Sequence, residues 1–234
     1  MNIALVVAGG TGSRMQSGRR KQYLELQGVP VVVMTLRVFD ASALINRIVL
    51  VVPEDDLSYC RDDLIAKAGF TKPVELVAGG RTRQGSVLNG LQAMAAADDD
   101  LVVIHDAVRP FLQASELAAC IETAAETGAC ILALKAFDTL KKTGPDGRIS
   151  TTLDRKSVWL AQTPQVFRYG KIHAAHVRAK QAGIEVTDDA ALLEMADQPV
   201  SLVPGSRQNI KITTPEDLAL AVAIASLNST GRNR

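Results

Sequence analysis

The chain has 234 residues, of which 47% are hydrophobic and only 4% are aromatic. This length supports one large α/β domain or two small ones, and a core with so few aromatic residues must be built from Val, Ile, Leu and Ala, as is typical of helix-covered parallel sheets. The 26 basic and 25 acidic residues nearly cancel, which excludes a general electrostatic attraction for nucleic acid or an anionic membrane. We expect one domain over residues 1–234, with no nucleic-acid or membrane partner.

Strand and helix patterns alternate from the start of the chain, in the order typical of a mostly parallel sheet. The expected strands are short apolar runs at residues 3–7, 48–52, 74–77, 101–104, 129–134, 200–203 and 209–213. The expected helices lie at residues 30–39, 54–67, 86–97, between 104 and 129, at 168–181, 188–196 and from 215 onward, where Thr214 is placed to cap the last helix. The predicted fold is a Rossmann-like α/β fold, a twisted sheet with helices on both faces.

The alternation stops at residues 138–160, which are polar and rich in turn signals. The sequence Gly-Pro-Asp-Gly at 144–147 separates two short segments and predicts a β-hairpin. An excursion of this length within a compact domain is either a functional arm or a disordered segment.

The cysteines and histidines predict no metal site. Cys60, Cys120 and Cys130 are odd in number and lack Cys-x-x-Cys spacing, so we expect reduced, partly buried thiols rather than a disulfide framework or a zinc site. His173 and His176 lie three residues apart on a predicted helix, and we expect a solvent-exposed helix face there rather than a shared metal. No apolar run reaches the roughly 18 residues of a membrane span, and the first strand leaves no room for a signal peptide. We expect a cytoplasmic protein.

The most informative segment is Ala-Gly-Gly-Thr-Gly-Ser-Arg-Met at residues 8–15, directly after the first strand. A strand that leads into a glycine loop places that loop at the carboxyl edge of the sheet, where open α/β folds bind ligands. Three glycines within four positions allow the main chain to approach an anion closely. Arg14 and Lys21 add two cations. The segment therefore predicts a polyphosphate site.

Two better-known glycine motifs are excluded by their spacing. A P-loop requires Gly-Lys-Ser/Thr, but Lys21 stands between Arg20 and Gln22. The dinucleotide-binding fingerprint would place its third glycine at Met15, and the acidic residue that binds the ribose is missing about twenty residues further on.

Residues 8–15 with Lys-Gln-Tyr at 21–23 resemble the signature of the sugar- and polyol-phosphate nucleotidyltransferases, and in particular of the 2-C-methyl-D-erythritol 4-phosphate cytidylyltransferases of the non-mevalonate isoprenoid pathway. The match covers nearly the whole chain. It includes the motifs at residues 79–87, 105–110, 138–139, 154–155, 162–165, 187–190, 209–213 and 215–218.

The resemblance implies a role for each matched residue. Arg14, Lys21, Arg155 and Lys211 are similar to the family's catalytic cations, the last two holding the acceptor's phosphate. The implied nucleotide-binding residues are Ala8, Gly9, Gly10, Thr11 and Gly12, with Gly80 and Ser86 reading the cytosine. The implied substrate-binding residues are Asp106, Arg109, Thr139, Thr187 and Thr213, and Asp106 is the candidate ligand of Mg²⁺. The sequence departs from some family members at Arg81, where they carry an acid.

The implied reaction is attack of an acceptor phosphate on the α-phosphorus of CTP, with pyrophosphate leaving. Because the nucleophile is already anionic, the expected catalysts are cations and Mg²⁺ rather than a strong base. The resemblance also implies a homodimer formed through the arm at 138–160. Two alternatives remain open at this point: a ribitol 5-phosphate cytidylyltransferase, and a nucleotide-binding module without catalytic activity.

Overall fold

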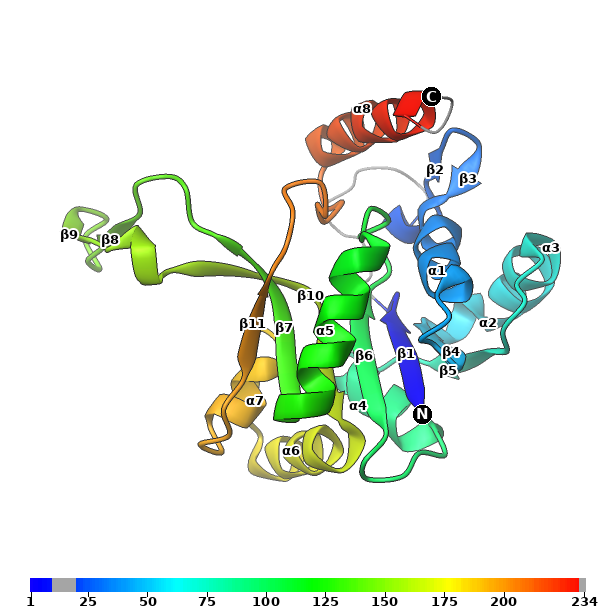
Figure 1. The fold of residues 1–234 in the computed structure, drawn as a ribbon, viewed down its shortest axis with the longest axis horizontal. Helices are drawn as coiled ribbons and strands as arrows, with labels where there is room; N and C mark the ends of the chain where they lie inside the picture. Colours follow the sequence, from blue (N-terminus) through cyan, green and yellow to red (C-terminus); the bar gives the residue numbers. More distant parts are fainter. Residues whose placement is uncertain (10–19, 232–234) are drawn as a thin grey trace.

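The computed structural model describes residues 1–9 and 20–231, with side chains up to residue 228. Its centre is a seven-stranded sheet in the order β11-β7-β10-β6-β1-β4-β5 (Figure 1). Every pair of neighbouring strands is parallel except the two pairs that include β10, so the mostly parallel sheet is confirmed. The strands are β1 (Asn2–Val7), β4 (Arg47–Val52), β5 (Val74–Ala78), β6 (Leu101–Asp106), β7 (Ala129–Lys135), β10 (Trp159–Arg168) and β11 (Ser201–Pro204).

Helices cover both faces of the sheet because the strands alternate their side chains between the two faces. In β1, Ala4 and Val6 belong to the core under α1 (Val31–Ala41) and α5 (Ala114–Thr127). Ile3 and Leu5 belong to the core on the opposite face of the sheet. That face is covered by α4 (Arg83–Ala93), α6 (Tyr169–Ala182) and the short α7 (Ala190–Glu194). Helix α8 (Pro215–Gly231) packs on a third apolar cluster, beside the sheet edge to which β1 points (Figure 1).

The region predicted as one helix at 54–67 is a helical segment of mixed geometry. It consists of η2 (Glu54–Asp56), α2 (Leu57–Tyr59), the π-type η3 (Cys60–Ile65) and α3 (Ala66–Ala68). Two short strands, β2 (Glu25–Leu26) and β3 (Val29–Pro30), precede α1. Among the described residues, none of the helices combines the length and apolar character that a membrane crossing requires.

Strand β10 is an interior antiparallel strand that sequence analysis did not predict. Its middle contains Gln162, Thr163 and Gln165, which are all buried, and the register with β7 shifts between Ala161 and Gln165. Polar residues and a proline at these positions hide the apolar alternation that indicates a strand. The buried polar groups instead make hydrogen bonds that organise the neighbouring loops.

The strand predicted at residues 209–213 is wrong, because this segment is an extended connection to α8. Among the described residues, the only backbone hydrogen bond that links this segment to a distant part of the chain is the one from Ile212 N to Val108 O, at 2.9 Å. Thr214 Oγ1 accepts a hydrogen bond from Asp217 N at 3.3 Å, as expected of a residue that caps a helix.

The hairpin predicted within residues 138–160 is confirmed. Strands β8 (Lys141–Thr143) and β9 (Ile149–Thr152) pair antiparallel and project to one side of the sheet (Figure 1). Every residue of both strands is exposed, so the two strands are not buried against any other element that the structure describes.

Candidate functional site

The carboxyl ends of the central parallel strands bring three sequence motifs to one edge of the sheet. Ala8 N donates to Val51 O at 2.7 Å, and Gly79 N donates to Val52 O at the same distance. Ala107 N donates to Val7 O at 3.0 Å. The start of the glycine loop, the Gly79–Gly80 pair and the end of β6 are therefore neighbours. Gly10, Thr11, Gly12 and Arg14 lie outside the described residues.

Gly9, Gly80 and Ser86 form the small compartment that the resemblance assigns to the base. Ser86 is buried, and its Oγ accepts from Gly80 N at 3.0 Å and donates to Thr82 O at 2.9 Å. A Cβ on Gly9 would lie 2.7 Å from Ser86 Oγ, and a Cβ on Gly80 would lie 2.8 Å from the carbonyl carbon of Gly85. Glycine is thus required at both positions because the surrounding chain leaves no room for a side chain.

Lys21 is held next to this compartment by the residue that follows it. Gln22 is buried, and its Nε2 donates to Ala8 O at 2.8 Å. On the other side, Arg20 forms an ion pair with Asp56 at 2.7 Å. These two contacts fix η1 (Lys21–Tyr23) against the start of the glycine loop.

A buried carboxylate, Asp106, is the electrostatic centre of the edge. Its Oδ2 lies 2.9 Å from Lys211 Nζ and 3.3 Å from Arg109 Nε, and its Oδ1 lies 3.2 Å from Arg83 Nε. Burial by itself would raise the pKa of Asp106, but the charges of Arg83, Lys211 and Arg109 outweigh it and hold the pKa well below its usual range. Asp106 is therefore ionised at every pH at which the protein would work.

Arg83 continues the charge network away from the edge. Its Nη1 lies 2.8 Å from Asp189 Oδ2, and Asp189 Oδ1 lies 3.1 Å from His176 Nε2. Asp189 and His176 are buried, so the expected solvent-exposed face at His176 is wrong. The helix does place His173 on its outer side, where its ring stacks on Tyr169.

His105 is linked to Asp106 through hydrogen bonds and forms no ion pair with the charged side chains that the structure describes around it. Asp106 N donates to Thr163 Oγ1, which donates to His105 Nδ1 at 3.1 Å, and His105 Nε2 donates to Arg109 O at 3.0 Å. Burial lowers the pKa of His105 to about 4, so the ring is neutral at physiological pH. Asn209, also buried, donates to Thr163 O and accepts from Arg109 Nη1 through its carbonyl.

The other residues that the resemblance assigned to substrate binding lie outside this cluster. Thr139 and Thr187 are exposed, and Thr213 Oγ1 donates to Asp217 Oδ2 at 2.7 Å at the start of α8. Arg155 is exposed at the base of the arm, where its Nη1 donates to Phe137 O at 2.6 Å. Within one chain the structure brings Asp106, Arg109 and Lys211 together, but Arg155 stands apart from them.

Sequence analysis missed three members of the site. Arg83, Asp189 and Gln165 were each inside a quoted motif, but no role was given to them. Gln165 Oε1 accepts from Asp189 N at 3.0 Å and from Ala190 N at 3.1 Å, and its Nε2 donates to Asp188 at 2.8 Å. The burial of Gln165, which only the structure shows, indicates this role, because a buried amide needs partners.

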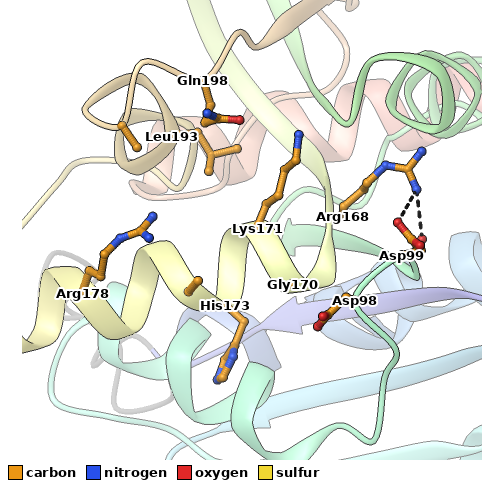
Figure 2. Close-up of a pocket in the computed structure, with 11 residues that line it drawn as sticks. Asp98, Asp99, Arg168, Gly170, Lys171, His173, Arg178, Leu193 and Gln198 are labelled. Carbon is orange, nitrogen blue, oxygen red and sulfur yellow. Dashed lines mark hydrogen bonds and ion pairs between the residues drawn. The ribbon is translucent and has the colours of Figure 1, made fainter.

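A pocket of about 760 Å³ lies away from this edge, beside the loop that leads into β6 (Figure 2). One of its basic residues, Arg168, pairs with Asp99 at 3.1 Å and donates to Ala125 O in the last turn of α5. The position of this cation suits a helix C-terminus, and we assign the pocket no role in the chemistry.

Glycine segments and a cation-bound carboxylate at the carboxyl edge of a mostly parallel sheet define a nucleotide-binding α/β protein built for phosphate chemistry. The family model of 2-C-methyl-D-erythritol 4-phosphate cytidylyltransferase, IspD, matches residues 2–226. The chain belongs to the IspD family.

Individual members of the family are similar to this chain over nearly the full length of both proteins. The chain is 49% identical to the 2-C-methyl-D-erythritol 4-phosphate cytidylyltransferase of Syntrophus aciditrophicus, over 94% of each protein, and 47% identical to that of Geotalea uraniireducens, over 97% of each. The crystal structure of 4-diphosphocytidyl-2C-methyl-D-erythritol synthase from Anaerococcus prevotii superposes with a TM-score of 0.86, at 33% identity and 96% coverage of both chains.

Proposed function

We propose that the chain transfers CMP from CTP to 2-C-methyl-D-erythritol 4-phosphate, giving 4-diphosphocytidyl-2-C-methyl-D-erythritol and pyrophosphate. Family membership over residues 2–226 supports this reaction. The observation that carries the proposal within the molecule is Asp106 in contact with Arg83, Arg109 and Lys211, at the edge that also holds the Gly80–Ser86 compartment. A donor pocket and a cation-rich acceptor site therefore stand side by side.

The nucleotide half of the proposal assigns the base to Gly80 and Ser86. The Gly80 N–H already donates to Ser86 Oγ, and the Ser86 hydroxyl donates to Thr82 O, so a cytosine amino group would meet the remaining lone pair of Ser86 Oγ and main-chain oxygens there. Ala8 and Gly9 begin the loop for the triphosphate, and Gly10, Thr11, Gly12 and Arg14 continue it outside the described residues. Lys21, held beside Ala8 through Gln22, would stabilise negative charge that develops on the phosphorus.

The acceptor half assigns the phosphate and hydroxyls to the Asp106 cluster. Three cations against two carboxylates, Asp106 and Asp189, leave one positive charge, which suits an incoming phosphate. Lys211 is 38% exposed and Asp106 only 7%, so Lys211 is the member of that pair that an acceptor would reach first. Thr187, which is exposed, is assigned to a substrate hydroxyl, and Thr139 and Thr213 keep the substrate roles that the resemblance implies.

Mg²⁺ is the proposed cofactor, with Asp106 as its protein ligand. Among the described residues, no three His, Cys, Asp or Glu side chains are grouped so that they could hold a metal ion. Mg²⁺ commonly takes one or two protein carboxylates and completes its shell with substrate phosphate oxygens and water. When bound, Mg²⁺ would neutralise triphosphate charge and withdraw electrons from the α-phosphorus.

The proposed assembly is a homodimer in the cytoplasm, formed through the arm at residues 138–160. Exposed apolar side chains on and beside the arm, Ile149 at 64% and Phe137 at 45%, support burial against a second copy. Arg155 would then reach the partner's acceptor site. Cys60, Cys120 and Cys130 are free and buried, which agrees with a reducing compartment.

The test is pyrophosphate release with CTP and Mg²⁺, run with 2-C-methyl-D-erythritol 4-phosphate and, in parallel, with ribitol 5-phosphate. The proposal requires a kcat/KM at least about a hundredfold higher for the first acceptor, which corresponds to at least about 2.7 kcal/mol of discrimination. A preference for ribitol 5-phosphate would assign the alternative acceptor, and no release with either would assign a nucleotide-binding module.

A further inference from the structure

A series of side-chain contacts connects helix α6 to the acceptor site. It runs from His176 through Asp189 and Arg83 to Asp106, with contacts of 3.1, 2.8 and 3.2 Å. The side chains of His176 and Asp189 are 0% and 1% exposed. Apart from the count of charges in the acceptor site, no role assigned so far uses Asp189 or His176, yet a buried charge is retained at a cost in free energy unless its partners satisfy it.

The backbone that carries Asp189 is fixed independently of its carboxylate. Gln165 Oε1 accepts from the N–H groups of Asp189 and Ala190. Gln84, the residue after Arg83, accepts from Val186 N and donates to Ile184 O. The loop between α6 and α7 therefore has its own anchors, and the Asp189 carboxylate is free to serve the Arg83 side chain.

We propose that Asp189 is a positioning residue for the transfer reaction: it holds the Arg83 guanidinium against Asp106, and His176 holds Asp189. Arg83 in turn fixes the orientation of the Asp106 carboxylate that the acceptor meets. The inference rests on the proposed function, since it concerns the acceptor half of the same site.

The geometry of Arg83 explains why a second carboxylate is needed. Arg83 donates a hydrogen bond through Nε to Asp106 and forms an ion pair through Nη1 with Asp189 Oδ2, a contact that lacks hydrogen-bond geometry, so its planar guanidinium faces a carboxylate at two points. Its side chain is 27% exposed, so the guanidinium could form hydrogen bonds to water in place of its contacts with the carboxylates. With Asp189 neutral or absent, Arg83 would keep one contact of 3.2 Å and lose the constraint on its rotation.

His176 supplies the donor that keeps Asp189 oriented. Its Nδ1 is buried without a hydrogen-bond partner among the described residues, so a proton on Nδ1 would be left unsatisfied. The tautomer with hydrogen on Nε2 avoids this cost and donates to Asp189 Oδ1. His176 therefore donates through Nε2 within the chain of contacts.

The main test is Asp189→Asn, with Asp188→Asn as the matched control. Asp188 lies in the same loop and bonds Gln165 rather than an arginine. We expect Asp189→Asn to lower kcat/KM for 2-C-methyl-D-erythritol 4-phosphate at least about tenfold, the loss typical of one charge-assisted contact, with KM for CTP within about twofold of wild type. Asp188→Asn should stay near wild type in both constants.

A second pair of variants tests the donor and does not depend on the stability of Asp189→Asn. Gln at position 176 can place an amide N–H where His Nε2 stands, whereas Leu cannot. We expect His176→Leu to raise the acceptor's KM severalfold and His176→Gln to restore it. His173→Leu, one turn away on the outer side of α6, should leave the acceptor's KM unchanged.

The decisive measurement is kcat/KM for 2-C-methyl-D-erythritol 4-phosphate in the double variant that combines Asp189→Asn with Arg83→Gln, compared with Arg83→Gln alone. If Asp189 acts through Arg83, the second substitution costs nothing further, because coupled residues are not additive. An additive loss, an equal rise in both substrates' KM, or no rescue by His176→Gln would overturn the inference. A wild-type chain without activity would instead refute the proposed function, so the two failures are distinguishable.

Discussion

Lys211 Nζ lies 2.9 Å from Asp106 Oδ2, and this ion pair joins the segment before α8 to the end of β6. The two residues lie far apart in the sequence, one near its middle and one near its end, and Ile212 N, bonded to Val108 O at 2.9 Å, holds the two segments together beside them. The pair combines a shielded carboxylate with a more exposed ammonium, which leaves Lys211 able to exchange one anionic partner for another.

Lys211→Ala should therefore affect the acceptor more than the nucleotide. We expect the KM for 2-C-methyl-D-erythritol 4-phosphate to rise and kcat to fall, each by about tenfold or more, because a lost phosphate contact weakens both binding and alignment. Steady-state kinetics with each substrate varied in turn measures this. Lys180→Ala, an exposed lysine on α6, is the control. Normal acceptor saturation in Lys211→Ala would show that Lys211 only neutralises Asp106.

Gly9→Ala should impair CTP binding through contact with one named atom. The new Cβ would lie 2.7 Å from Ser86 Oγ, and this hydroxyl is fixed by bonds to Gly80 N and Thr82 O. We expect the KM for CTP to rise at least about tenfold, since overpacking a rigid site commonly costs 1–3 kcal/mol.

The double variant Gly9→Ala with Ser86→Ala separates steric from polar effects. Removal of the hydroxyl leaves the Ser86 Cβ at 3.4 Å from the new methyl group, which is close to ordinary contact. CTP binding, measured by calorimetry, should be stronger in the double variant than in Gly9→Ala. Equal or weaker binding would mean that the glycine serves the ligand's own approach rather than the contact with Ser86.

The arm makes a prediction about quaternary structure. If Arg155 serves the partner's site, mixing Lys21→Ala with Arg155→Ala restores activity. In a mixed dimer the subunit that retains Lys21 receives an intact Arg155 from its partner, whereas the other site lacks both. Random exchange makes about half of the dimers mixed and restores roughly a quarter of all sites.

The mixing experiment needs proof of subunit exchange, which mass-tagged chains provide. Activity should rise above that of either parent after exchange and not before it. If exchange is complete and activity remains at parental levels, Arg155 does not act across a dimer. Its bond to Phe137 O within its own chain would then be its main contact.

His105 predicts a loss of stability in mild acid. Its pKa is lowered to about 4 in the folded protein from an ordinary value of 6.5. As the pH falls from 6.5 towards 4, the unfolded chain binds a proton that the folded chain does not, so stability present above pH 6.5 is lost by about 3 kcal/mol over that window.

Urea unfolding at pH 7 and pH 4.5 measures this loss. His105→Gln should be less stable than wild type at pH 7, because it loses hydrogen bonds to Thr163 and Arg109, yet it should lose less stability between the two pH values. His173→Gln, at an outer position on α6, controls for the removal of a histidine. A wild-type pH dependence that is unchanged in His105→Gln would contradict the assignment.

The sequence by itself determined the sheet and the family. Apolar runs such as residues 3–7 and 101–104 identify buried parallel strands because a strand covered on both faces needs no polar side chain. The glycines at 9, 10 and 12 predict a loop whose backbone can approach an anion closely, because glycine has no Cβ. Patterns of this kind involve only residues that are close together in the sequence, so they can be recognised without knowing which distant segments come into contact.

The tertiary structure alone decided how the charges are paired and how polar segments are used. Nothing in the sequence around Arg83 indicates that it bridges Asp106 and Asp189, because an ion pair depends on the positions of two distant segments after folding. Strand β10 was hidden for the same reason: Gln165 is buried because its amide anchors the loop at Asp189, and that partner lies in another part of the chain. Periodicity records burial against apolar neighbours, whereas buried polar networks appear only once the fold has brought their partners together.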